Sequence, residues 1–390
     1  MDIRSAIANS NIGHKIYNFR NKQYYDYLWK HYNTDILSLS QIDYKQLKNS
    51  VLHYTNSLKE KNGEFRFAAS SIEPCLYATV YGYLIYDLLD ELTEGDEKWL
   101  KEYLDSFQID NGLFYDKRNY TKLYDDGDGW GARHLALHII ILYESIKAEP
   151  NKSFSYLTPY HDQEYVNKWL HGLNWKNAWA ASNSVMNIGC MLQYQRDFLH
   201  CNIGVGLDYI IEWLKTNMIN RIPLWHEGRM NNESAVYDSI RAAYHLLPIL
   251  IYEGFTFDNS KDAIKLILKS QNRWGGFDFS RISSACHDID ALDPLIRLSE
   301  KRDKKVEEAL IRALNNILFN QNEDGGFVFS RDKNGFCYGG CDNLRSLPNE
   351  SNLFGTWFRL VSVLEILDYF DIKKFSNHQV PGYEFEIKEK

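Results

Sequence analysis

The chain has 390 residues, a formal net charge of −8 and 44% hydrophobic residues. An acidic balance without a basic stripe argues against a nucleic-acid partner. No apolar run reaches about 18 residues, so we expect no membrane span.

The N-terminal end lacks the apolar segment of a secretory signal peptide, and we expect a cytoplasmic protein. Six cysteines are scattered without a Cys-x-x-Cys pair, which in a cytoplasmic chain predicts free thiols rather than a disulfide framework. Residues 1–42 are polar and rich in tyrosine, and we interpret them as an N-terminal helical arm. Residues 43–390 contain no linker-like stretch and are predicted to form a single domain.

From residue 43 onward, amphipathic stretches alternate with more apolar ones. The amphipathic stretches carry apolar residues at i, i+3, i+4 and i+7 with Lys and Glu between them, which is typical of surface helices. They span residues 43–60, 96–108, 162–173, 204–218, 260–271 and 304–321. A short turn containing Gly or an aromatic residue follows each of them, and Gly there supplies the positive φ that ends a helix.

The apolar stretches after these turns are hydrophobic nearly all round, which is typical of helices packed on both sides. They span residues 70–89, 129–146, 180–197, 233–254, 287–300 and 350–370. No stretch alternates polar and apolar residues, so no sheet is predicted. Six amphipathic and six apolar helices predict an all-α chain, an (α/α)6 toroid of six helical hairpins whose inner helices surround a central cavity.

One turn recurs with an obvious spacing. Gln271–Phe277 reads QNRWGGF and Gln321–Phe327 reads QNEDGGF, an offset of 321 − 271 = 50 residues, which lies within the range of repeat architectures. These copies, which cover roughly the last third of the chain, resemble the Gln-x-x-x-Gly-Gly-aromatic repeats of the terpenoid cyclase and protein prenyltransferase superfamily. The resemblance implies the same toroid. The chain is also similar to toroids with WGARH and CxDxDA motifs that accompany bacterial surface-polysaccharide genes.

The openings of the apolar helices hold most of the polar residues, and the toroid would bring these openings to one mouth of the cavity. Helix N-termini also present unpaired N–H groups, which favour an oxygen-rich or anionic ligand. We therefore expect a substrate-binding set of Asp128, Trp130, Arg133, Asn177, Trp179, Asn183, Asn232, Glu233, Glu350, Asn352, Trp357 and Arg359. For the Asp and Asn residues the alternative is a helix N-cap, the commonest use of these side chains at such positions.

Asp288 and Asp290 are the predicted acid/base pair, because two neighbouring carboxyls raise the pKa of one and leave an acid beside a base. His287 or His134 would assist them. Tyr237 and Arg241, one helical turn apart, would stabilise negative charge or bind a substrate carboxylate. A buried ion pair between Arg241 and one of the two aspartates is the alternative for that arginine.

The segment HDIDALD, residues 287–293, resembles the Asp-x-Asp-Asp motif of class II terpenoid cyclases, which donates the proton that starts cyclisation. The resemblance assigns this role to Asp288 or Asp290, although Ala291 replaces the third aspartate. The second helical domain of those cyclases has no counterpart in this chain. Protein prenyltransferases bind zinc, and Cys286, His287 and Asp288 offer the same ligand types in a different order. We expect no cofactor and keep zinc at these residues as the alternative.

Three functions follow from this set. The first is an acid/base enzyme, such as a lyase, hydrolase or epimerase, that acts on a carbohydrate-containing substrate such as a sugar intermediate or oligosaccharide and stacks it on Trp130, Trp179 and Trp357. The second is a terpenoid-cyclase-like or prenyl-handling enzyme with Asp288 or Asp290 as proton donor. The third is a non-catalytic binding module. The cavity lining separates the first two: amides and ionisable groups favour a glycan, and aromatic rings favour an isoprenoid.

Overall fold

A computed structural model of the chain describes residues 22–30, 38–119, 129–228, 230–279, 282–300, 302–332, 334–374 and 381–382. The described residues are mostly helical, which confirms the prediction of an all-α fold class. Six helices form an outer layer: α3 (Tyr44–Ser57), α5 (Glu94–Phe107), α7 (Gln163–Gly172), α9 (Gly206–Thr216), α11 (Ser260–Ser270) and α13 (Lys304–Phe319). Six others form an inner layer: α4 (Leu76–Leu88), α6 (Trp130–Ser145), α8 (Ala178–Asp197), α10 (Glu233–Tyr252), α12 (Ala285–Leu298) and α14 (Leu353–Tyr369).

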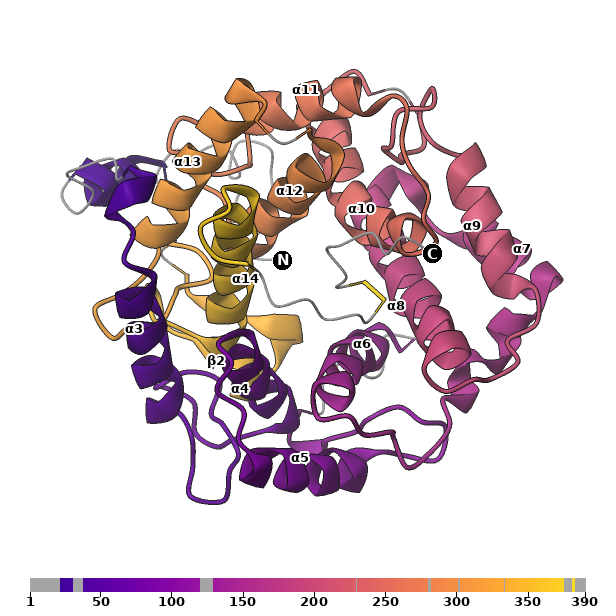
Figure 1. The fold of residues 1–390 in the computed structure, drawn as a ribbon, viewed down its shortest axis with the longest axis horizontal. Coiled ribbons are helices and arrows are strands. Elements are labelled where there is room, and N and C mark those ends of the chain that lie inside the picture. Colours follow the sequence, from indigo (N-terminus) through magenta and orange to yellow (C-terminus); the bar gives the residue numbers. More distant parts are fainter. Residues whose placement is uncertain are drawn as a thin grey trace, which may run out of the picture.

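The inner helices pack side by side in chain order. Each of them contacts the next one from α4 to α14, and α14 contacts α4, so the series closes on itself (Figure 1). The seam between the last and first units is also bonded through the backbone, where Leu353 N donates to Phe67 O at 3.0 Å. The polar N-terminal ends of the inner helices, which are far apart in the sequence, are therefore brought to the same central space.

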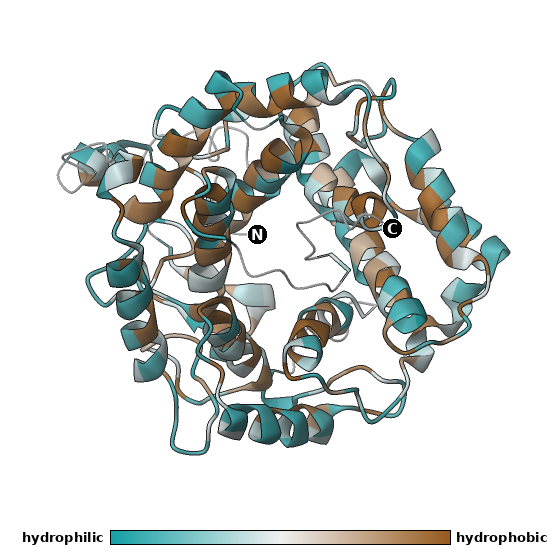
Figure 2. Ribbon diagram, viewed as in Figure 1, coloured by the Kyte–Doolittle hydropathy of each residue, from teal (hydrophilic) through white to brown (hydrophobic). Residues whose placement is uncertain are grey.

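The outer helices follow the predicted amphipathic pattern. Figure 2 shows hydrophilic residues on their outward sides and hydrophobic residues where they meet the inner helices. Several begin at side-chain caps that satisfy the first free N–H groups: Asp43 accepts from Gln46 N, Asp162 accepts from Tyr165 N, and Thr93 forms a capping box with Asp96. Polar caps and one apolar face fix where each outer helix begins and which side it buries.

The Gln-x-x-x-Gly turn has a structural basis that extends beyond its two obvious copies. Gln271 Nε2 donates to Gly275 O and to Ala309 O on α13, both at 2.8 Å. Equivalent bonds join Gln108 to Gly112 O at 3.1 Å and Gln321 to Gly325 O at 2.9 Å. The glutamine amide thus closes its own turn and, at Gln271, ties the turn to the next outer helix.

The two middle units use tryptophan instead of this glutamine. Trp175 Nε1 donates to Leu170 O of α7, and Trp225 Nε1 donates to Leu214 O of α9, both at 2.9 Å. Each indole N–H donates to one of the last carbonyl groups of a helix, which have no partner within the helix. The turns after α7 and α9, which lack the glutamine, are therefore tied to the preceding helix by a tryptophan N–H instead.

Two expectations need correction. The first inner helix begins at Leu76 rather than residue 70, because Pro74 disfavours helical geometry in the residue before it. A small antiparallel pair also exists where no sheet was predicted, formed by β1 (Phe336–Cys337) and β2 (Arg345–Ser346). It belongs to the segment between the last Gly-Gly turn and α14, and two-residue strands are too short to show an alternating pattern.

A helical stretch at residues 22–30 and short 3₁₀ helices complete the described elements. The 3₁₀ helices are η1 (Leu39–Gln41), η2 (Lys117–Asn119), η3 (Ser155–His161), η4 (Trp175–Asn177), η5 (Tyr338–Gly340) and η6 (Asp342–Leu344).

Candidate functional site

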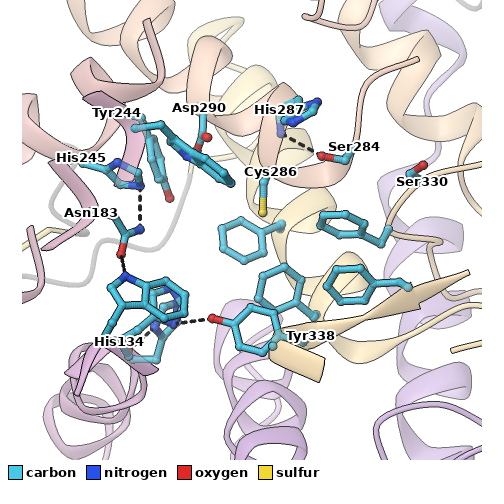
Figure 3. Close-up of a pocket in the computed structure, with 18 of the residues that line it drawn as sticks. His134, Asn183, Tyr244, His245, Ser284, Cys286, His287, Asp290, Ser330 and Tyr338 are labelled. Atoms are coloured by element: carbon cyan, nitrogen blue, oxygen red, sulfur yellow. Dashed lines mark hydrogen bonds between the residues drawn. The ribbon is translucent and has the colours of Figure 1, made fainter. Parts of the chain in front are cut away.

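A cavity of about 480 Å³ lies inside the inner helices, at the end where the β1–β2 segment folds over them (Figure 3). Its volume is typical of a small-molecule site. Aromatic side chains are the largest group in the lining: Trp130, Trp179, Tyr244, Phe329, Phe336, Tyr338, Phe354 and Phe358. The imidazole, amide and carboxyl groups of the lining come from His134, His138, Asn183, Asn187, His245, His287, Asp290 and Asp332.

One wall of the cavity is a continuous group of rings. Phe329 stacks on Phe336 with ring centroids 3.9 Å apart, and Phe336 lies 5.5 Å from Phe354. Phe354 in turn contacts Tyr338 at 4.9 Å and Phe358 at 4.7 Å. The segment between the last Gly-Gly turn and α14, together with α14 itself, supplies these rings, and a wall of aromatic rings suits an apolar or cationic group.

Asp290 is the buried acid of the site. It lies on α12, is 2% exposed, and its Oδ2 atom has no hydrogen-bond partner among the described residues. Burial raises the pKa of Asp290 well above its usual range, against the opposing influence of Arg241 and the Trp179 indole. Burial thus favours the protonated, neutral form of this carboxyl, and its Oδ2 atom is left for the cavity.

Asp288 has a different environment, although it lies only two residues away. Its carboxylate accepts from Phe277 N at 2.9 Å, from Asn316 Nδ2 at 3.2 Å and from Arg359 Nη1 at 3.1 Å. Asp288 and Arg359 are each 1% exposed, and neither lines the cavity. Asp288 thus ties α12 to α14 and to the last residue of the first Gly-Gly-Phe turn.

The predicted helpers of the aspartates lie around α12. His287 lines the cavity, and its Nδ1 is 3.1 Å from Asp278 Oδ2, while burial lowers the pKa of the imidazole. Tyr237 lies outside the lining, and its hydroxyl donates to Phe277 O. Arg241 also lies outside it, with its guanidinium 3.8 Å from the Tyr237 ring centroid.

The carboxylate partner of Arg241 is neither of the two predicted aspartates. The ion pair that it forms is with Asp238, at 3.9 Å. Its guanidinium carbon also lies 5.1 Å from the Trp179 ring centroid. The charge still acts on the acid, because Arg241 is the strongest influence that lowers the pKa of Asp290. Arg241 thus favours the Asp290 anion without being bonded to it.

Helices α6, α8 and α10 contribute a polar wall to the same cavity (Figure 3). His134 Nδ1 lies 2.8 Å from Tyr77 Oη and 3.2 Å from Tyr338 Oη. His245 contacts Ser182 Oγ through Nδ1 at 2.9 Å and Asn183 Nδ2 through Nε2 at 3.0 Å. Burial lowers the pKa of His245 to about 3 and that of His134 well below its usual range, so this wall is uncharged at neutral pH.

Six of the predicted site residues line the cavity together: Trp130, His134, Trp179, Asn183, His287 and Asp290. Three predicted binding residues are instead helix N-caps. Asn177 accepts from Ala180 N at 3.4 Å, Asn232 from Ala235 N at 2.9 Å, and Asn352 from Gly355 N at 2.8 Å. Each of these three side chains caps the start of a helix, which was the alternative to substrate binding for such residues.

Four further predicted residues lie away from the lining. Arg133 donates to Tyr160 Oη at 3.1 Å, and Glu350 accepts from Ser70 N at 2.7 Å. Trp357 is buried among the inner helices, and Glu233 is exposed in the first turn of α10. Asp128 lies outside the described residues.

Several lining residues were absent from the predicted site set. His138 lies one turn beyond His134, Asn187 one turn beyond Asn183, and His245 one turn beyond Arg241. The i, i+4 spacing of polar residues within apolar helices was the available signal. The aromatic side chains of the segment between the last Gly-Gly turn and α14 gave no comparable signal. Their position depends on how that segment folds over the inner helices.

In the described part of the chain, no three His, Cys, Asp or Glu side chains come together in a way that could hold a metal ion. The zinc alternative at Cys286, His287 and Asp288 is not carried further. Within the same residues, no helix combines the length and apolar character needed to cross a membrane.

Comparison with known proteins gives limited similarity. No protein-family model matches the chain, and no curated protein matches its sequence. Among solved structures, it is similar to the type II terpene cyclase MstE from Scytonema in the apo form, with 11% identity and a TM-score of 0.45 over 84% of this chain and 99% of that one. An arginine-to-alanine variant of MstE in complex with geranylgeranyl dihydroxybenzoate, its substrate, gives 11% identity and a TM-score of 0.44 over 84% and 98% of the two chains.

Proposed function

We propose that this chain is a single-domain (α/α)6 toroid preceded by an N-terminal arm, and a cyclase-like acid/base enzyme in which Asp290 protonates an isoprenoid. The observation that carries the proposal is a buried carboxyl whose Oδ2 has no hydrogen-bond partner among the described residues, at a cavity that has one wall of aromatic rings. The closed contact order of the inner helices supports the toroid.

The composition of the lining favours an isoprenoid over a glycan. Eight aromatic side chains line the cavity, against two carboxamides, two carboxyls and four imidazoles. A sugar carries hydroxyl groups around its whole rim, and those that meet the aromatic wall would be left without partners, at a cost of about 1–3 kcal/mol each. An isoprenoid loses nothing there and gains by burial. The cyclase-like alternative therefore replaces the carbohydrate reading.

The chemistry assigned to Asp290 is proton donation to a carbon–carbon double bond. The O–H bond of the acid breaks, a C–H bond forms, and a carbocation develops on the neighbouring carbon. A second double bond attacks that carbon and closes a ring, and loss of a proton elsewhere leaves a product isomeric with the substrate. Burial keeps Asp290 protonated until the reaction, and Arg241 and Trp179 favour the anion that donation leaves.

The aromatic wall then has a defined role. A carbocation within about 6 Å of an aromatic ring face is stabilised by the ring quadrupole, by roughly 2 kcal/mol where water is excluded. Phe329, Phe336, Phe354 and Phe358 form such faces in contact with one another. The ring wall would bind the developing cation without offering a nucleophile that ends the reaction early.

The cavity volume bounds the substrate. An apolar cavity of about 150 Å³ holds benzene, so roughly 25 Å³ is needed per carbon and 480 Å³ accepts about 15 to 20 carbons. Isoprenoids with three or four five-carbon units fit this bound.

The test is product analysis with C15 and C20 prenyl alcohols and diphosphates in H₂O and in D₂O. The proposal predicts a product with the substrate's mass in H₂O and one mass unit more in D₂O, because one deuteron is added and one proton is lost. Asp290→Asn is expected to abolish the product. Asp332→Asn is the matched control, since that carboxyl accepts from Ser330 Oγ at 3.2 Å and has its own partners. Formation of the same product by Asp290→Asn would overturn the role of this acid, and tight binding without turnover in the wild type would favour the binding module.

A further inference from the structure

The polar wall of the cavity contains a carboxamide chain whose orientation is fixed by chemistry. Trp130 Nε1 is only a donor, and it lies 2.5 Å from Asn183 Oδ1. The amide nitrogen of Asn183 therefore faces His245 Nε2, at 3.0 Å. Asn187, one turn further along α8, donates through Nδ2 to the same Asn183 oxygen at 3.1 Å.

This orientation leaves one acceptor unused. Because Asn187 Nδ2 donates to Asn183, its Oδ1 atom is turned away from that residue. Asn187 is 1% exposed and lines the cavity, and its Oδ1 has no hydrogen-bond partner among the described residues. A buried carbonyl oxygen without a partner costs about 1–3 kcal/mol, so a ligand that donates a hydrogen bond there regains this energy.

The neighbours of Asn187 define which donor fits. Asn183 Nδ2 donates to His245 Nε2, so the proton of that imidazole is on Nδ1, which faces Ser182 Oγ at 2.9 Å. The imidazole is thus the neutral form. No Lys or Arg side chain occurs among the described residues of the lining. The wall accordingly offers no charge to a diphosphate or a carboxylate and suits a neutral group.

We infer that Asn187 Oδ1 is a subsite for a hydroxyl group of the substrate, so that the ligand is an isoprenoid alcohol or phenol rather than a prenyl diphosphate. This inference rests on the proposed function. It places the polar end of the substrate at the α8 wall and leaves the hydrocarbon chain to the ring wall. The Asn183–Trp130 bond positions the subsite, because it determines which atom of Asn187 faces the cavity.

The test compares a C20 prenyl alcohol with its methyl ether, which keeps the shape and the oxygen but has no O–H donor. Dissociation constants are measured by calorimetry in the Asp290→Asn protein, so that turnover does not interfere. The alcohol is expected to bind about fivefold more tightly than the ether, the worth of one hydrogen bond. Adding Asn187→Leu is expected to remove this preference while leaving the affinity for the ether within about twofold.

Asn320→Leu is the matched control. Asn320 is fully buried, donates through Nδ2 to Asn316 O at 2.7 Å and does not line the cavity, so its loss is expected to leave the preference for the alcohol intact. Equal binding of alcohol and ether before Asn187 is changed, or a preference that survives Asn187→Leu, would overturn the subsite alone. The comparison of alcohol with ether in the protein that keeps Asn187 tests for hydroxyl recognition even if Asn187→Leu does not fold. Binding of neither compound would overturn the isoprenoid function and the subsite with it.

Discussion

Asp288 and Asp290 show how one helix gives two carboxyls opposite properties. Residues two apart on an α-helix differ by about 200° around its axis, so they point to different sides of α12. Asp288 points to Arg359 and the turn at Phe277, where three donors hold it. Asp290 lines the cavity, and one of its oxygens has no hydrogen bond within the part of the chain that the structure describes.

This difference predicts opposite effects on stability. Asp288→Asn leaves Arg359 as a buried charge without its partner, and we expect a loss of about 3–5 kcal/mol in the free energy of unfolding. Below about pH 4, where the Asp290 carboxyl is neutral in the folded and the unfolded chain alike, Asp290→Asn exchanges one neutral group for another and is expected to change that free energy by less than about 1 kcal/mol. Urea denaturation of both variants measures the two values. A larger loss for Asp290→Asn than for Asp288→Asn would contradict the assignment.

The pH dependence of stability provides a second prediction for Asp290. A carboxyl with a raised folded pKa stays protonated while the unfolded chain has already released its proton, so stability falls as pH rises through that interval. Asp290→Asn lacks this loss, and its free energy of unfolding relative to the wild type is expected to increase from about pH 4 towards neutral pH. Glu365 and Asp293, whose pKa values burial also raises, are present in both proteins and cancel in the comparison. A constant difference across this range would mean that Asp290 titrates normally.

At the scale of the element, the Gln-x-x-x-Gly turn explains the repeat that the sequence displays. Gly112, Gly275 and Gly325 have φ values of +91° to +95°, a conformation that other residues rarely adopt. At Gly325 the space is also closed, because a Cβ atom would lie 2.1 Å from Ser50 O of α3. The last unit therefore approaches the first outer helix through a position that only glycine fits.

Gly325→Ala tests this close approach. Left-handed backbone alone costs about 1–2 kcal/mol for alanine, and the contact with Ser50 O adds to it, so we expect a loss in the free energy of unfolding of about 3 kcal/mol or more. Gly228→Ala is the control, since Gly228 has φ of +95° but no atom within 4 Å of the added Cβ. Equal losses in the two variants would show that the approach to α3 is unimportant.

The elements could be predicted from the sequence because their causes are local. Amphipathic spacing, caps such as Asp43 and Asp162, and the glycines of the turns are all readable in one dimension. The start of α4 was displaced by Pro74, which was also readable. Residues 336–346 could not be assigned, because their two-residue strands depend on pairing with each other and on contacts with residues that are distant in the sequence, such as the rings of α14.

At the scale of the whole molecule, the contact order of the inner helices assembles the site. His134 on α6, Asn183 on α8, His245 on α10 and Asp290 on α12 meet at one cavity although they are far apart in the chain. The sequence could show that polar residues gather at helix openings. It could not separate caps such as Asn177 and Asn232 from lining residues such as Asn183, because the distinction depends on which way each helix is turned about its axis.

The proposed chemistry requires above all that Asp290 is protonated at neutral pH. The most direct measurement is the infrared difference spectrum at neutral pH between the wild type and Asp290→Asn, with Asp288→Asn as reference. We predict that the wild type shows the C=O stretch of a neutral carboxylic acid, that Asp290→Asn loses this band, and that Asp288→Asn loses a carboxylate band instead. A spectrum in which Asp290→Asn removes a carboxylate band and leaves the acid band unchanged would contradict the account.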